Sequence, residues 1–268
     1  MREHKKKNIL VTGAAGGLGS ALARRLAGKA ETLLLTDLDA EGLRSLQSTL
    51  SGHRVFCRVC DVTDEEAVAS LGPWVRECCD GLDVLINNAG VGFSGGLERT
   101  SLQEWRRLME LNLYASIRHV DVFLPELRAR AGQVVNISSG QAFFRLPSWG
   151  AYSVTKQALA SYSDLLRGEN EDAGVAVTTV FPFLINTGFY TGMRAESTLS
   201  SWAMKCMPWI SMTPDQVAAR VERSIARREP VELVSAVNHV GMLLQALPPL
   251  GRLWTRWGSR LMLQGVGR

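Results

Sequence analysis

Near the N-terminus, residues 8–19 read NILVTGAAGGLG, an apolar run that leads into a glycine-rich turn. Glycines let a backbone turn sharply and approach a pyrophosphate without a side-chain collision. The turn opens a helix expected at residues 20–30, whose N-terminus supplies free N–H groups and a favourable dipole to an anion. The spacing of Gly13, Gly17 and Gly19 departs from G-x-G-x-x-G. The strand–turn–helix context nevertheless favours dinucleotide binding.

The alternation of apolar runs and helix-like segments continues along the chain. Strands are expected at residues 33–36, 55–59, 84–86, 134–137 and 175–181. Helices are expected at residues 40–50, 64–79, 102–130 and 151–170, and Thr213-Pro214 has the pattern of a helix cap. Short continuous apolar strands between helices predict a parallel sheet covered on both faces. We therefore expect an α/β fold, a doubly wound sheet in a single domain over residues 1–268.

Composition and charge exclude several classes of protein. The 268 residues carry a net charge of +4 and are 46% hydrophobic, values that argue against disorder, collagen and coiled coil. The overall charge does not indicate a nucleic-acid-binding surface. No apolar run reaches the roughly 18 residues that a membrane-spanning helix needs. The basic start, residues 1–7, is like that of a signal peptide, but glycines interrupt the apolar region after it. Five cysteines without a disulfide-like framework indicate a reducing, cytoplasmic compartment.

Cys57-x-x-Cys60 has the spacing of half a metal site. It lies in a segment that alternates like a strand, where positions three apart face opposite sides. Partner histidines and cysteines are missing from the pattern as well. We expect no metal site.

Asp37 ends the second expected strand. A carboxylate there can accept hydrogen bonds from an adenosine ribose, and it would repel a 2′-phosphate. Ala14 and Ala15 bring no positive charge to offset that repulsion. The pattern favours NAD over NADP, with NADP left open. The alternative is a helix-capping or turn aspartate, since Asp39 lies nearby.

The ordered motifs over residues 8–187 resemble the short-chain dehydrogenase/reductase family. The matching residues are Thr12, Gly13, Gly17, Gly19, Asp61, Val62, Asn87, Asn88, Ala89, Gly90, Asn112, Ser139, Tyr152 and Lys156. A glycine-rich loop alone would be a weak signal, whereas the ordered set is highly specific. The resemblance implies a Rossmann-like domain, commonly with seven parallel strands, and hydride transfer between a nicotinamide dinucleotide and an alcohol or carbonyl.

Tyr152 and Lys156 are four residues apart in an expected helix, so both point from one face. A free tyrosine has a pKa of about 10, too high for an efficient base at neutral pH. A nearby ammonium and a cationic nicotinamide favour the phenolate, so Tyr152 would act as general acid and base. By resemblance, Lys156 also holds the nicotinamide ribose. The pair alone could be an ordinary helical surface pair, but Ser139 at a strand end favours catalysis.

Ser139 would hydrogen-bond the substrate oxygen and stabilise its developing charge. Ser138 is the nearest alternative, and spacing to Tyr152 favours Ser139. The resemblance gives Asn112 a place in a water-linked proton relay through Lys156; the alternative is a satisfied structural amide.

The resemblance also assigns residues to the cofactor. Asp61 and Val62 would flank the adenine, and Asn87 and Asn88 would brace the sheet beside the cofactor, with Asn87 expected to make the contact. The expected set is Gly13, Gly17, Leu18, Gly19, Asp37, Asp61, Val62, Asn88, Ala89, Gly90, Tyr152, Lys156, Pro182, Ile185 and Thr187. Phe183 is a departure, because members often carry glycine after the proline. A large ring at this position leaves the local backbone path and the substrate entrance undetermined by the sequence.

Residues 183–212 are irregular and rich in aromatic side chains and methionine, which favours a substrate lid. With the apolar segment after Ser139, they predict a pocket for a lipophilic alcohol or ketone: steroid, retinoid, fatty or aromatic. The alternative is that these residues only pack the lid on the core.

Residues 239–268 form a C-terminal apolar and basic extension. Its apolar residues recur at helical spacing beside an arginine stripe of Arg252, Arg256 and Arg260. This basic amphipathic pattern fits peripheral contact with a membrane surface, and equally packing on the domain itself or on a partner subunit. The resemblance implies a homodimer or homotetramer formed by the helices near 102–130 and 151–170.

The sequence thus predicts an NAD-dependent oxidoreductase that interconverts a lipophilic secondary alcohol and a ketone. A non-catalytic dinucleotide sensor or scaffold on the same fold is the alternative. An epimerase or dehydratase is a third reading, disfavoured because the C-terminal region leaves little room for a sugar-nucleotide domain.

Overall fold

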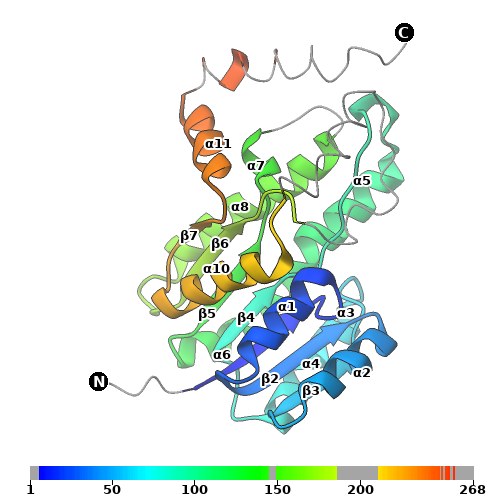
Figure 1. Ribbon diagram of the computed structural model, residues 1–268, viewed down its shortest axis with the longest axis vertical. Coiled ribbons are helices and arrows are strands. Elements are labelled where there is room, and N and C mark those ends of the chain that lie inside the picture. Colours follow the sequence, from blue (N-terminus) through cyan, green and yellow to red (C-terminus); the bar gives the residue numbers. More distant parts are fainter. Residues whose placement is uncertain are drawn as a thin grey trace.

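The computed structural model describes residues 6–144, 149–185, 211–247, 249, 251–253 and 256. Seven strands form one parallel sheet in the order β3-β2-β1-β4-β5-β6-β7 (Figure 1). The strands are β1 (Lys7–Thr12), β2 (Ala30–Asp37), β3 (Val55–Val59), β4 (Val84–Asn87), β5 (Gln133–Ile137), β6 (Ala176–Phe181) and β7 (Val231–Leu233). The predicted doubly wound α/β fold is confirmed.

Helices cover both faces of the sheet (Figure 1). One face carries α1 (Gly17–Leu26), α2 (Ala40–Thr49) and α10 (Pro214–Arg227). The other carries α3 (Glu65–Ala69), α4 (Leu71–Cys78), α6 (Ala115–Ala129) and α8 (Gly150–Glu169). Successive residues of a strand point to opposite faces of the sheet, so Leu10 packs in one hydrophobic core and Val11 in the other. This is why the strands are continuously apolar in sequence.

The helices differ in detail from the expected ranges. The segment expected at 64–79 is split at Ser70 into α3 and α4. The segment expected at 102–130 consists of α5 (Leu102–Met109), a π-helical turn over Glu110–Tyr114, and α6. The first helix starts at Gly17, inside the glycine-rich turn, rather than at Ser20. The expected cap before α10 is confirmed, since Thr213 and Gln216 form a reciprocal capping box.

Three short elements were not expected from the sequence. They are the 3₁₀ turn η1 (Leu97–Arg99), α7 (Gln141–Phe144) and β7. Each is too short to give a periodic signal. Helix α11 (Ala236–Ala246) overlaps the apolar part of the predicted extension.

The cysteines of the Cys57-x-x-Cys60 pair diverge as expected. Cys57 packs against one core and Cys60 against the other. Burial raises the pKa of both thiols to about 11. The four cysteines in the described part of the chain are free, and no cluster of metal-ligating side chains is found there. None of the helices searched in that part is both long and apolar enough to span a bilayer.

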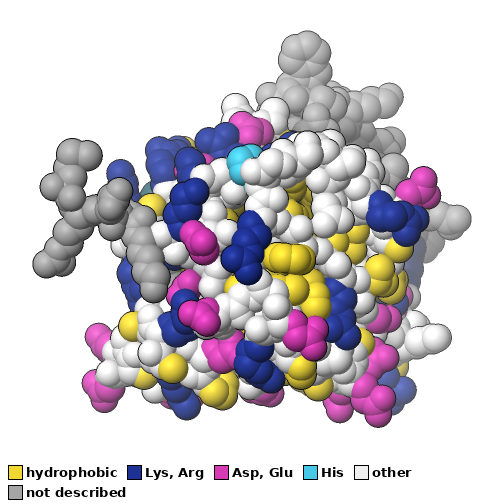
Figure 2. All heavy atoms as spheres, turned by 90° about the horizontal axis from the view of Figure 1, so that it is seen from below, with side chains coloured by type: hydrophobic (Ala, Val, Ile, Leu, Met, Phe, Trp, Pro, Cys, Tyr) yellow, Lys and Arg dark blue, Asp and Glu magenta, His cyan; other side chains and the backbone are white. Residues whose placement is uncertain are grey.

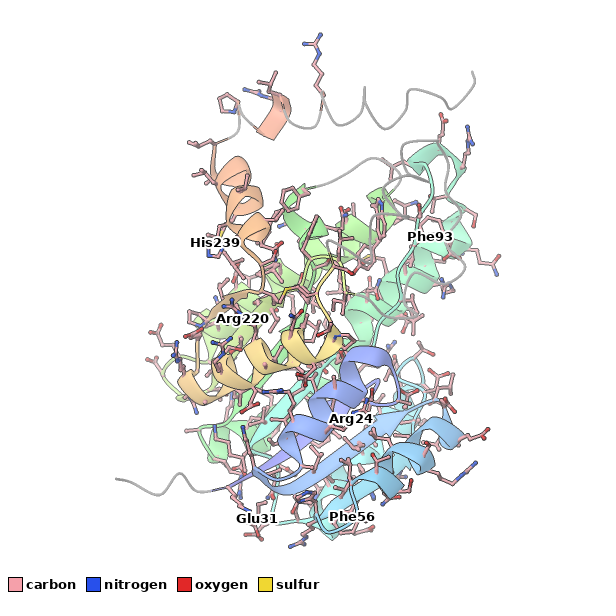
Figure 3. All side chains as sticks on the ribbon, viewed as in Figure 1. Arg24, Glu31, Phe56, Phe93, Arg220 and His239 are labelled. Carbon is pink, nitrogen blue, oxygen red and sulfur yellow. The ribbon has the colours of Figure 1, made fainter. Side chains whose placement is uncertain are left out.

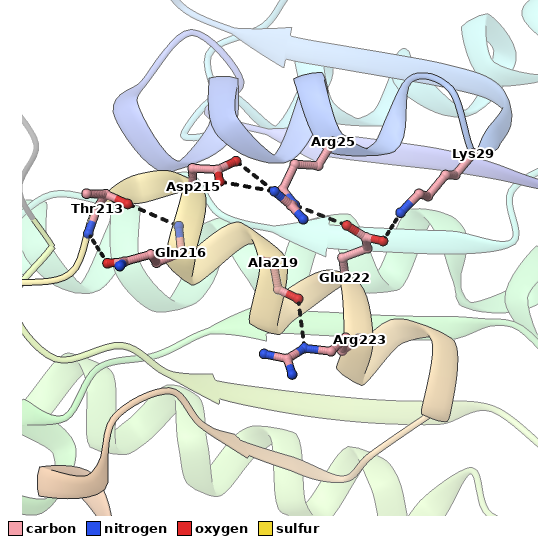
Figure 4. A network of polar contacts seen from close by, with 8 residues as sticks. All are labelled: Arg25, Lys29, Thr213, Asp215, Gln216, Ala219, Glu222 and Arg223. Carbon is pink, nitrogen blue, oxygen red and sulfur yellow. Dashed lines mark hydrogen bonds and ion pairs between the residues drawn. The ribbon is translucent and has the colours of Figure 1, made fainter.

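An ion-pair network joins the first helix to the C-terminal half of the fold (Figure 4). Arg25 on α1 donates to Asp215 at 2.9 Å and to Glu222 at 3.1 Å, and Lys29 also pairs with Glu222. Both acidic residues lie on α10. The helix that begins at the glycine-rich turn is thereby tied to the helix that follows the predicted lid.

Candidate active site

A cavity of about 550 Å³ lies at the carboxyl ends of the strands, with walls from the segments that follow β1, β2, β3, β4, β5 and β6. Between β1 and β4 the strand order reverses, which is where open α/β sheets bind ligands. Every described member of the predicted cofactor set lines this cavity, together with Ser139. Residues far apart in the sequence are therefore brought into one wall.

The glycine-rich turn is shaped for close approach. Gly13 has a φ of 63°, and a Cβ on it would lie 2.8 Å from the Cα of Ala89. A Cβ on Gly19 would clash with the carbonyl oxygen of Gly13 and lie 2.8 Å from the Cα of Ala14. Gly16 caps α1 without a side-chain hydrogen bond, so the helix N-terminus presents bare backbone to the cavity. These features fit the diphosphate of a dinucleotide.

Asp37 lies at the cavity wall rather than at a helix cap. Its Oδ2 accepts a hydrogen bond from the backbone N–H of Ala15 at 2.9 Å, and its Oδ1 accepts one from Asp39 at 3.0 Å. The capping role belongs to Asp39, which accepts from the N–H groups of Glu41 and Gly42. Asp37 therefore braces the glycine-rich turn and also lines the cavity.

The two asparagines after β4 have different positions. Asn88 lines the cavity, and its Nδ2 donates to the carbonyl oxygens of Thr12 at 2.9 Å and Gly13 at 3.0 Å. Asn87 is buried in the sheet, where its Nδ2 donates to Asn136 Oδ1 at 2.9 Å. Asn88, a member of the expected cofactor set, therefore lines the cavity, whereas Asn87, expected to make the contact, does not. Asn87 is the last residue of β4, so its side chain hydrogen-bonds to Asn136 on the neighbouring strand β5 and does not reach the cavity.

Tyr152 and Lys156 are both buried on α8 and line the cavity. The Lys156 Nζ lies 6.0 Å from the centre of the Tyr152 ring and donates to the Ile137 carbonyl at 2.9 Å. Burial lowers the pKa of Lys156 to about 8. The pair shares one helix face, as the four-residue spacing predicted.

The two serines after β5 are used differently. Ser138 Oγ donates to the Lys156 carbonyl at 2.8 Å and so anchors α8 to the end of β5. Ser139 Oγ accepts from the backbone N–H of Gln141 at 3.2 Å, which leaves its hydroxyl hydrogen to donate to a ligand. This difference favours Ser139 over Ser138 as the residue that contacts substrate.

Asn112 lies in the π-helical turn, behind the cavity wall. Its Oδ1 accepts from the Val91 N–H at 2.9 Å, and its Nδ2 donates to the Val91 carbonyl at 3.0 Å and to Thr155 Oγ1 at 3.1 Å. A Cβ on Gly90 would lie 2.8 Å from Asn112 Oδ1 and 3.3 Å from Lys156 Nζ. Asn112 thus has a structural role and lies beside the lysine.

Phe183 turns away from the cavity. Its ring lies against Gly140 and 5.1 Å, centre to centre, from the ring of Phe144. Pro182 keeps the strand end in place, because its carbonyl accepts from the Gly140 N–H at 2.7 Å. The backbone strain falls on the next residue, Leu184, which has a φ of 45°. Phe183 itself is not part of the cavity wall.

A family model described as short chain dehydrogenase matches residues 7–198. The chain belongs to the short-chain dehydrogenase family. This is a family of oxidoreductases, and the matched range contains each of the residues on which the resemblance rested.

Short-chain dehydrogenases of several organisms are similar to this chain. An uncharacterized oxidoreductase of Mycobacterium tuberculosis is 31% identical over 232 residues, 84% of this chain and 65% of that protein. The chain thus spans about two thirds of the length of such relatives. A Burkholderia phymatum structure in complex with NAD covers 94% of this chain and 97% of its own, with a TM-score of 0.84 and 25% identity. An alcohol dehydrogenase of Thermococcus sibiricus complexed with 5-hydroxy-NADP covers 85% of this chain and 95% of its own, with a TM-score of 0.74 and 27% identity.

Some site residues of this short-chain dehydrogenase were missed or lie outside the described chain. Thr187 and most of the predicted lid, 183–212, fall outside it. The cavity wall also contains residues that no motif indicated: Leu38, Cys60, Val91, Leu111, Ile137 and Leu184. Most of them adjoin a motif residue, so a rule that extends each strand end by one or two residues could have found them.

Proposed function

We propose that the protein is an NAD(H)-dependent oxidoreductase that interconverts a lipophilic secondary alcohol and the corresponding ketone. The observation that carries the proposal is the meeting of Ser139, Tyr152 and Lys156 on the wall of one cavity, next to a glycine-rich helix N-terminus. A non-catalytic sensor or scaffold would not require these three side chains to meet in one cavity. This chain spans only part of the length of such relatives, so the activity of the whole protein is a proposal and not a finding.

The proposed mechanism assigns one task to each side chain. A bound nicotinamide dinucleotide would supply the hydride in reduction and accept it in oxidation. Tyr152 would donate a proton from its phenolic oxygen to a carbonyl, or accept the proton of an alcohol. Protonated Lys156 would favour the phenolate, and Ser139 would hydrogen-bond the substrate oxygen. By resemblance, Asn112 would help position the water of a proton relay that runs through Lys156.

NAD rather than NADP is proposed because of Asp37. Its carboxylate is held at the cavity wall by the N–H groups of Ala15 and Asp39. Held there, it would accept hydrogen bonds from ribose hydroxyls and repel a 2′-phosphate. A lipophilic substrate is supported by the apolar side chains in the cavity wall, which include Val91, Leu111 and Leu184.

We further propose a cytoplasmic protein that forms a homodimer or homotetramer. The free cysteines of the described chain agree with a reducing compartment. Of the helices expected at subunit contacts, α6 and α8 cover the same face of the sheet, and α5 contacts α8 (Figure 1).

Two measurements test the proposed function. Fluorescence titration should show tighter binding of NADH than of NADPH, and Asp37→Ser should reduce that preference. Tyr152→Phe should bind NADH normally but lose turnover of lipophilic alcohols by about 10²–10⁴-fold. Tyr162→Phe, on the same helix, is the control and should keep its activity. Wild-type preference for NADPH would overturn the NAD assignment, and unchanged turnover by Tyr152→Phe would overturn the mechanism.

A further inference from the structure

Helix α11 presents a stripe of apolar side chains to solvent. Val237 is 47% exposed, Val240 54%, Leu243 58% and Leu247 45%. Their spacing of three and four residues places them along one side of the helix. Four large apolar side chains in a row on one exposed helix face differ from singly scattered apolar residues, which need no explanation.

The opposite side of α11 is fixed to the body of the protein. Asn238 is fully buried, and its Nδ2 donates to the carbonyl of Phe181 at the end of β6. Gly241 lies against the Phe144 ring and the Cβ of Phe143, and an added Cβ would approach the Phe144 ring to 2.8 Å. The helix stands beside α7 at one end of the molecule, with His239 near its first turn (Figures 1 and 3). Because the side of α11 with Asn238 and Gly241 packs on the protein, the side with the apolar stripe faces solvent.

The charges after this helix are of one sign. The sequence contains no aspartate or glutamate after Glu232, while arginines stand at positions 252, 256, 260 and 268. Arg252 and Arg256 are exposed. Elsewhere, on the face shown in Figure 2, basic and acidic side chains are interspersed. The apolar stripe is thus followed in the sequence by positive charge, with no acidic residue after Glu232.

We infer that α11 and the arginines after it dock on a bilayer surface that carries anionic lipids. The apolar stripe would enter the boundary between headgroups and acyl chains, and the arginines would pair with lipid phosphates and carboxylates. A second copy of the chain is the weaker candidate. A two-fold contact would set this patch against itself, with arginines near arginines and no acidic residue after Glu232 to pair with them.

The test is co-sedimentation of the full chain with vesicles. Binding is expected to vesicles of phosphatidylcholine with about a third phosphatidylserine, and to be much weaker with phosphatidylcholine alone. Val240→Glu should abolish binding. The matched control is Val59→Glu, at a valine on edge strand β3 that is 52% exposed. Arg252→Gln with Arg256→Gln should weaken binding by about fivefold per arginine, and Arg44→Gln should not.

Binding needs no turnover, so the result is independent of the proposed enzyme activity. Loss of vesicle binding by Val240→Glu but not by Val59→Glu, together with a fall in binding at high salt, supports the inference. Absence of binding by the wild-type chain overturns it. Vesicle binding that is unchanged in Val240→Glu also overturns it. The same holds if the wild-type chain does not bind vesicles but self-associates in sedimentation velocity, and Val240→Glu removes that self-association.

Discussion

Lys156 keeps a titratable ammonium inside the protein, where burial lowers its pKa to about 8 from 10.5. The folded state disfavours the charged form, so at neutral pH this side chain destabilises the ligand-free fold. Between about pH 8 and pH 10.5 the unfolded chain binds more protons than the folded one. Stability from this group therefore rises with pH across that window. A site built for catalysis gives up some stability in this way.

We expect Lys156→Met to raise the free energy of unfolding at neutral pH by about 1–3 kcal/mol. The gain in stability is partly offset because the variant loses the hydrogen bond from Lys156 to the Ile137 carbonyl. Turnover should be lost in the same variant. Urea denaturation at neutral and alkaline pH measures the effect, with exposed Lys6→Met as the control. A less stable Lys156→Met protein would contradict this account.

Gly19→Ala should disrupt the glycine-rich turn, because the added methyl group meets backbone atoms of Gly13 and Ala14 rather than a movable side chain. We expect a loss of about 2 kcal/mol or more in stability and weaker NADH binding. Gly168→Ala on α8 is the matched control, since a Cβ there meets nothing within 4 Å. That change should stabilise the helix by up to about 1 kcal/mol. Thermal unfolding and NADH titration of both variants would decide the matter.

The motifs predicted most of the described cavity wall, because a strand end fixes where the next few residues must lie. They could not say which of two neighbouring side chains faces the cavity. Asn87 and Asn88 differ by one position, yet one joins the sheet and the other lines the cavity. Phe183 was another such case: its contacts with Gly140 and Phe144 are set by tertiary packing, which no local pattern contains.

At the scale of elements, α6 carries a buried histidine. The Nδ1 of His119 lies 2.7 Å from the carbonyl oxygen of Ala115, and its Nε2 is buried without a described partner. Burial lowers the pKa of His119 below its ordinary value of 6.5. Below about pH 6.5 the unfolded chain takes up a proton that the folded chain resists, so stability falls as pH falls.

His119→Asn should flatten this loss of stability on the acid side of pH 6.5. His53→Asn, at an exposed position before β3, serves as the control and should leave the slope unchanged. Chemical denaturation over a pH series measures both. An unchanged slope in His119→Asn would mean that another group accounts for the acid sensitivity.

Elements with a long periodic pattern were predictable, and short or irregular ones were not. The sequence from 102 to 130 is helical throughout its pattern, but the π turn that carries Asn112 widens a single turn and leaves no periodic trace. Strand β7 has three residues, which is below what alternation can define.

At the scale of the whole molecule, the network of Arg25, Lys29, Asp215 and Glu222 connects the region of α1 with α10. Burial alone would raise the pKa of Glu222, but hydrogen bonds from Lys29 and Arg25 outweigh it and hold the pKa below 4.5. Stability from Glu222 is therefore present above pH 4.5 and is lost as pH falls through the lowered pKa. Sequence alone gave no means to pair α1 with α10, because the pairing spans most of the chain.

Glu222→Gln should lower the free energy of unfolding by about 1 kcal/mol at low salt, and by less at high salt. Exposed Glu171→Gln is the control and should have little effect. Denaturation at two ionic strengths gives both numbers. A loss that does not shrink in high salt would show that packing, rather than charge, holds α10 to α1.

The strand order also has a consequence for synthesis on the ribosome. After the first three strands pair, β4, β5, β6 and β7 join the sheet at one growing edge in the order in which they emerge. Domains fold from the N-terminal side as they are made. The glycine-rich turn would therefore be formed early, Ser139 would follow with β5, and the wall at Pro182 would close only with β6. A nascent chain halted before β6 would hold half of a dinucleotide site with an open sheet edge, the state most exposed to mispairing.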